Sequence, residues 1–123
     1  MLANRTLVAF VSTTDFSKAR AFYGTMLGLP IVSEDAFALV VDANGIMLRI
    51  SKVDKLIPQR FTVLGWEIRD IAEMVTKMKE TGIVFERYDF LEQDAAGIWT
   101  APSGARIAWF KDPDGNVLSI SQP

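Results

Sequence analysis

Apolar residues gather in short strand-like runs and one helical stripe, and this order occurs twice along the chain. In the first half, four strands are predicted at residues 7–11, 29–33, 37–41 and 46–52. Asp15 supplies a helix N-cap after the first run, and Gly28 stands where a left-handed C-cap ends a helix. The first half therefore predicts the order β-α-β-β-β.

The second half repeats that order with one additional short strand. Its strands are predicted at residues 61–68, 84–87, 98–100, 106–110 and 117–121. Asp70 begins the second helix, Glu73 completes a capping box, and Gly82 ends the helix. The two helix caps, Asp15 and Asp70, lie 55 residues apart. Matching order and spacing indicate a duplicated module.

These patterns predict a single α+β domain over residues 1–123. The first module covers about residues 5–52, a polar connector about 53–60, and the second module about 61–121. We expect the strands to form a curved mixed sheet around a cavity, with the helices on the outer face. The connection at residues 88–97 is either a lid over that cavity or a loop whose Phe90 and Leu91 pack onto the sheet.

The amino-acid composition excludes several classes of catalytic and metal-binding site. The chain has no His and no Cys, so it has no imidazole base, thiolate nucleophile or disulfide. The formal net charge is −2 and no basic run tracks a phosphate backbone, so nucleic acid is not an expected partner. No apolar run approaches the ~20 residues that span a bilayer, and the first residues carry no signal-peptide core. We expect a cytoplasmic protein without membrane contact.

Strand alternation assigns residues to the cavity face of the sheet. Phe10, Met47 and Val63 are expected to line the cavity, with Ser119 on the last strand, and Phe110 joins them if its hairpin pairs across the turn as drawn. Trp99 and Phe110 are candidates for stacking on an aromatic ligand, although core or dimer packing explains them equally well. The candidate ligand-binding residues are Phe10, Met47, Arg49, Val63, Trp99, Phe110 and Ser119.

Arg49 and Glu67 are the two charged candidates on that face. Arg49 lies in an otherwise apolar strand, so its guanidinium needs a partner: a ligand carboxylate or phosphate, an internal carboxylate such as Glu67, or water at a sheet edge. Glu67 is a weak catalytic candidate, as a general base, and a solvated strand end explains it more simply.

Three segments resemble the signatures of a known superfamily. They are DFSKARAFY at residues 15–23, LGL at 27–29 and FKDPDGNVL at 110–118. They are similar to signatures of the vicinal oxygen chelate superfamily, which includes glyoxalase I, bleomycin-resistance proteins and extradiol dioxygenases. The resemblance runs over nearly the whole chain, and it implies this scaffold, its cavity and a homodimer.

The resemblance also implies where a metal would bind. Metalloenzymes of the superfamily take four ligands, usually His, Gln or Glu, from the first and last strands of the two modules. The corresponding positions here hold Val8, Arg49, Val63 and Ser119. None of these is a usual metal ligand, and a guanidinium repels a divalent ion. We expect a member that lacks the metal ligands and needs no cofactor.

Three hypotheses follow. The favoured one is a metal-independent binding protein that holds an aromatic, cationic or metabolite ligand in the cavity; residues 61–123, with 6 basic and 10 acidic groups, favour a cation. The alternative is a glyoxalase- or dioxygenase-like enzyme, a lyase, isomerase or oxidoreductase, with an unconventional metal site or acid–base chemistry by Glu67 and Arg49. A third is an assembly or regulatory module whose own side chains fill the cavity.

Overall fold

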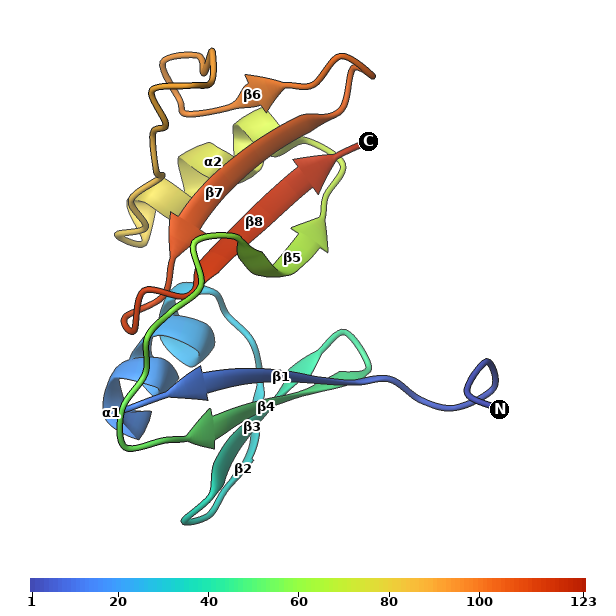
Figure 1. Ribbon diagram of the computed structural model, residues 1–123, viewed down its shortest axis with the longest axis vertical. Coiled ribbons are helices and arrows are strands. Elements are labelled where there is room, and N and C mark those ends of the chain that lie inside the picture. The colour runs from blue at the N-terminus through green and yellow to red at the C-terminus, as the bar shows by residue number, and fades with distance from the viewer. The chain divides into compact units, whose positions relative to one another are not determined.

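A computed structural model describes residues 1–123, and the chain divides into two compact units, Met1–Ile57 and Pro58–Pro123 (Figure 1). Each unit contains one four-stranded mixed sheet with helical structure on one face. The prediction of an α+β chain built from two tandem β-α-β-β-β modules is confirmed. No helix in either unit has the length and apolar character needed to cross a membrane.

The first unit has the strand order β1-β4-β3-β2. Its strands are β1 (Val8–Thr13), β2 (Ile31–Glu34), β3 (Ala38–Ala43) and β4 (Ile46–Lys52). β1 runs parallel to β4, and the other neighbouring pairs are antiparallel. The Asn-Gly hairpin predicted between the last two strands is present, with Asn44 at φ 55 and Gly45 at φ 90.

The helical segment of the first unit begins where its cap is predicted. Asp15 accepts a hydrogen bond from the Lys18 amide at 3.1 Å and starts α1 (Phe16–Ala19). The helix continues in the wider π-helical form as η1 (Arg20–Met26), and the Leu27 amide bonds the Phe22 carbonyl at 2.9 Å. This segment places Phe22 and Tyr23 in the core, which also contains Leu39, Val41, Leu48 and Ile50.

The second unit repeats the topology with the order β5-β8-β7-β6. Its elements are β5 (Thr62–Glu67), α2 (Ile71–Glu80), β6 (Trp99–Thr100), β7 (Arg106–Lys111) and β8 (Val117–Gln122). Asp70 caps α2 by accepting from the Glu73 amide at 3.1 Å. Ile71, Val75 and Met78 are buried on the face of α2 that packs on the sheet.

One predicted strand, at residues 84–87, does not form. Only Phe85 makes a bridge, to Phe110, and the Glu86 amide bonds the Trp109 carbonyl at 2.8 Å. The next amide that a strand would use, that of Tyr88, donates instead to the side-chain oxygen of Gln93 at 2.7 Å. A side-chain acceptor therefore ends the pairing after a single bridge.

Candidate functional site

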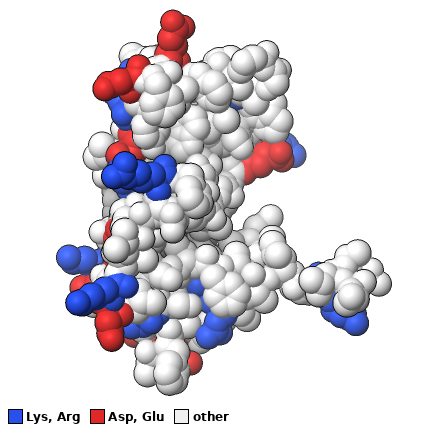
Figure 2. All heavy atoms as spheres, in the orientation of Figure 1, with Lys and Arg blue, Asp and Glu red and all other residues white.

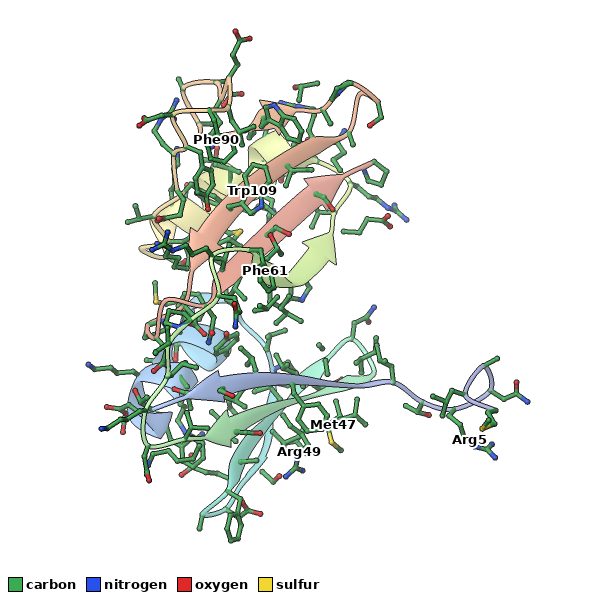
Figure 3. The ribbon with its side chains drawn as sticks, viewed as in Figure 1. Arg5, Met47, Arg49, Phe61, Phe90 and Trp109 are labelled. Atoms are coloured by element: carbon green, nitrogen blue, oxygen red, sulfur yellow. The ribbon has the colours of Figure 1, made fainter.

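The sheet of the first unit has one uncovered face, and it carries apolar side chains around an arginine. Val8 lies beside Met47 and Phe10 beside Arg49 in the parallel pair, so these four residues share that face. Phe10 is 62% exposed. Met47 and Arg49 project from β4 in Figure 3, and Val40 lies opposite Arg49 on β3. The predicted positions of Phe10, Met47 and Arg49 on one face are confirmed by the register.

Arg49 has no hydrogen-bond or ion-pair partner within the chain, although it is half-buried. Its charge reaches Asp35, whose pKa is lowered mainly by the amides of Phe37 and Ala38 and in smaller part by this guanidinium. An internal ion pair, one of the explanations considered for Arg49, is therefore absent. Its guanidinium donors stay available to a ligand anion or to water.

The uncovered face of the second unit is built around Trp109. Ser119 on β8 lies between Gly65 on β5 and Trp109 on β7. The Trp109 Nε1 donates to Thr62 Oγ1 at 3.0 Å, so the indole reaches across β8 to the edge strand. In Figure 2 uncharged side chains cover the middle of this face of the second unit, with charged groups at its margins.

The predicted place of Phe110 on this face is wrong. Phe110 is 0% exposed and pairs with Leu118 on the face that packs against α2. Its ring lies 6.4 Å from that of Trp66 and 5.7 Å from that of Phe85, between ring centroids. Phe110 is a core residue.

The physical reason lies in the second hairpin. Asp42 pairs with Met47 across four residues in the first unit, whereas Lys111 pairs with Val117 across five in the second. One additional residue in the connection reverses the face of every side chain on β7. Trp109 therefore takes the place predicted for Phe110, and counting the turn residues is the signal that identifies it.

The remaining candidates fall at separate places on the second unit. Val63 lies in a bulge of β5, because Thr62 pairs with Val117 and Leu64 with Leu118. Ser119 is half-buried, and Glu67 is exposed at the end of β5 without a hydrogen bond or ion pair. Glu67 and Arg49 belong to different units, and no observation favours joint acid–base chemistry by the two.

A row of aromatic rings extends from Trp109 in both directions. The centroid of the Trp109 ring lies 6.0 Å from that of Trp99 and 5.7 Å from that of Tyr88. The Tyr88 centroid lies 5.5 Å from that of Phe90. Burial, followed by the nearby Glu86 carboxylate, raises the pKa of Tyr88. Sequence reasoning missed Tyr88 and Trp109, because their proximity depends on the path of the loop between them.

Side-chain hydrogen bonds brace the loop at residues 88–97, and Gln93 makes three of them. Gln93 accepts from the Tyr88 amide at 2.7 Å, and its amide nitrogen donates to the carbonyls of Glu86 at 3.0 Å and Gly97 at 2.8 Å. Arg87 donates to the carbonyls of Gln93 and Asp94 at 3.2 and 2.9 Å. Phe90 is 81% exposed, so the interpretation in which Phe90 packs onto the sheet is wrong. The loop contacts the sheet through Tyr88, whose ring centroid lies 5.7 Å from that of Trp109, and a lid over a cavity stays a prediction.

A groove of about 490 Å³ lies within the second unit, between this loop and β6. It is lined by Phe90, Leu91, Glu92, Asp94, Ile98, Trp99 and Thr100. Trp99 connects the groove to the aromatic row. No three His, Cys, Asp or Glu side chains of the chain gather in a group that could hold a metal ion.

Comparison with known proteins gives relatives by structure alone. No family model matches the sequence, and no curated protein matches it. The chain is similar to a bleomycin-binding protein solved in complex with bleomycin, with 25% identity and a TM-score of 0.74 over 98% of this chain and 99% of that one.

Two further solved structures have the same architecture. A glyoxalase family protein from Enterococcus faecalis is 19% identical, with a TM-score of 0.76 over 98% of this chain and 99% of that one. A lactoylglutathione lyase from Agrobacterium tumefaciens is 17% identical, with a TM-score of 0.74 over 99% of this chain and 96% of that one. These relatives include both a binding protein and an enzyme.

Proposed function

Since the chain has the fold of the glyoxalase/bleomycin resistance protein/dioxygenase superfamily, we propose that it is a metal-independent small-molecule-binding protein. It holds an aromatic, cationic or metabolite ligand against the uncovered faces of its sheets. One observation carries the proposal: the uncovered face of the second unit presents a row of aromatic rings beside a groove of about 490 Å³. Aromatic side chains beside a few placed polar groups are a common feature of ligand sites.

The four positions that the superfamily resemblance links to metal ligands support binding without a metal. Val8 and Val63 offer no lone pair, and Arg49 carries a positive charge. Ser119 has a neutral hydroxyl and pairs with Trp109, whose indole crosses β8 to reach Thr62. Recognition by stacking, apolar contact and hydrogen bonding needs none of these positions to hold an ion.

Each candidate residue has a role in this proposal. On the first unit, Phe10 and Met47 provide apolar contact and Arg49 binds an anionic group of a ligand. On the second unit, Val63 provides apolar contact and Trp99 stacks on an aromatic ring. Ser119 contributes a hydrogen-bonding hydroxyl. Trp109 replaces Phe110 as the aromatic residue that β7 contributes.

We also propose that the protein acts as a cytoplasmic homodimer. Leu2 and Leu7 are exposed apolar residues before the edge strand β1, and a second copy would cover them. Light scattering coupled to size exclusion measures the mass directly. A monomer at all concentrations tested contradicts the dimer and leaves the binding proposal intact.

The binding proposal is tested by a thermal-shift screen of untagged, metal-depleted protein against aromatic amines and small carboxylic acids. A ligand at 100 times its Kd adds about 2.7 kcal/mol to the stability of the folded state. For carboxylic acids, Arg49→Ala is expected to weaken binding about tenfold or more, because a charge-assisted hydrogen bond is lost. Arg20→Ala is the matched control, since Arg20 pairs with Glu34 at 2.8 Å.

Two outcomes contradict the proposal. The first is the absence of any stabilising ligand in the screen. The second is a stoichiometric transition metal that survives dialysis and is required for binding.

A further inference from the structure

We infer that the groove between the loop at residues 88–97 and β6 is a binding site for a flat aromatic cation. The inference rests on the proposed function and deepens it, because it names one subsite and one ligand class. Every residue that forms the groove belongs to the second unit.

The walls of the groove favour a flat ring system. Phe90 is 81% exposed while its ring rests 5.5 Å from that of Tyr88, measured between centroids. Trp99 lines the groove and is itself held 6.0 Å from Trp109. An exposed aromatic side chain with a fixed neighbour is a ready stacking surface, because little rotamer freedom remains to be lost on binding. In Figure 3 Phe90 and Trp109 lie on the loop and on β7 of the same unit.

The charge of the groove favours a cation. Glu92 and Asp94 line it, and no Lys or Arg does. Glu92 is exposed and makes no hydrogen bond or ion pair, so its carboxylate is available to a ligand. The neighbouring cation, Arg87, is engaged by the carbonyls of Gln93 and Asp94. A ligand cation therefore meets carboxylates beside aromatic faces, two groups that both attract positive charge.

The groove is shaped before any ligand arrives. Gln93 bonds the backbone groups of Glu86, Tyr88 and Gly97, which lie at the two ends of the loop. Asp94 Oδ1 accepts from the amides of Ala96 and Ile98, both at 2.9 Å. A braced loop lowers the ordering cost of binding. The volume of about 490 Å³ lies within the range of pockets that hold drug-sized molecules. A fused system of two or three rings with a charged nitrogen fits both the size and the charge.

Equilibrium dialysis with proflavine, a flat tricyclic cation, tests the inference on the whole chain. Anthracene-2-sulfonate is the ring-matched anion and is expected to bind at least tenfold more weakly. Phe90→Ala is expected to weaken proflavine binding about tenfold through lost stacking. Glu92→Gln is expected to weaken it about threefold at low salt, and added salt to remove that difference.

Two further variants test whether proflavine binds at the groove or elsewhere on the molecule. Phe37→Ala removes an aromatic residue of the first unit that is 77% exposed, and is expected to leave proflavine binding unchanged. Gln93→Ala removes the brace and no groove-lining atom, and is expected to weaken proflavine binding while the near-ultraviolet circular dichroism shows a folded core.

Proflavine affinity that is unchanged by both Phe90→Ala and Glu92→Gln, or equal affinity for the sulfonate, overturns the inference. Affinity that depends on Arg49 instead of Phe90 also overturns it and leaves the proposed function standing. The proposed function itself fails separately, when the thermal-shift screen finds no ligand.

Discussion

The two units share a backbone plan and differ in what their uncovered faces present. Phe10 beside Arg49 in the first unit corresponds to Gly65 beside Ser119 in the second, at offsets of 55 and 70 residues. The first unit presents apolar side chains around an unpaired guanidinium, and the second presents a row of aromatic rings beside acidic groups. The duplicated units therefore share the strand order, while the hairpin register and single positions set the chemistry of each face.

Two small changes account for much of the difference. A hairpin longer by one residue turns Trp109, rather than its neighbour, onto the uncovered face. Gly65 stands where the first unit has Phe10, and a Cβ at Gly65 would lie 2.7 Å from Ser119 Oγ. On the same face, the Trp109 indole crosses β8 and donates to Thr62 Oγ1 at 3.0 Å.

The largest expected effect tests the face assignment on β7. Phe110→Ala is expected to lower the free energy of unfolding by about 3–5 kcal/mol, because it opens a cavity beside Phe85 and Trp66. Trp109→Ala is expected to lower it by only about 1–2 kcal/mol, the loss of a half-buried ring and one hydrogen bond. Urea unfolding of both variants gives the comparison. Equal losses of stability, or a larger loss for Trp109→Ala, contradict the assignment of Phe110 to the core.

A smaller effect is expected at the position where the two units differ most in side-chain size. Gly65→Ala is expected to destabilise the fold by about 1 kcal/mol, because the new Cβ crowds Ser119. Phe10→Ala, at the corresponding position of the first unit, is expected to change stability by about 0.5 kcal/mol or less. Thermal unfolding measures both.

Adding Ser119→Ala to Gly65→Ala provides the control for this pair. The double variant is expected to regain part of the lost stability, since the crowded Oγ is gone. Additive losses indicate that Gly65 is required for another reason.

The smallest expected effects concern the pH dependence of stability, which differs between the two units. The pKa of Asp35, in the first unit, is lowered by amide hydrogen bonds, so its stabilisation is present above pH 3.8 and is lost as pH falls through the lowered pKa. The pKa of Tyr88, in the second unit, is raised by burial, so its stabilisation is present below pH 10.0 and is lost as pH rises through the raised pKa. Asp35→Asn and Tyr88→Phe are each expected to flatten one limb of the stability–pH curve. A variant that flattens neither limb contradicts the assigned pKa shift.

Local signals predicted most of the fold. Asp15 and Asp70 mark the helix starts because a capping carboxylate acts on amides within three residues. Alternation on β4 and β8 placed Arg49 and Ser119 on the uncovered faces, because their neighbours Leu48 and Leu118 are buried. These features depend on residues close together in the sequence.

The candidate site was less predictable because it depends on contacts between distant residues. The face of Phe110 depends on one additional residue in the second hairpin. Residues 84–87 do not continue as a strand because the Tyr88 amide donates to the side chain of Gln93. The pairing of Tyr88 with Trp109 depends on the path of a braced loop. Tertiary hydrogen bonds of this kind leave no periodic pattern in a single sequence.

Ligand binding without a metal is tested most directly by a thermal-shift screen that is run twice, on protein dialysed against EDTA and on the same protein supplied with Zn²⁺. If Val8, Arg49, Val63 and Ser119 bind no ion, as proposed, the same ligands are expected to stabilise both samples by the same amount. Ligands that stabilise only the zinc-supplied sample would contradict this proposal.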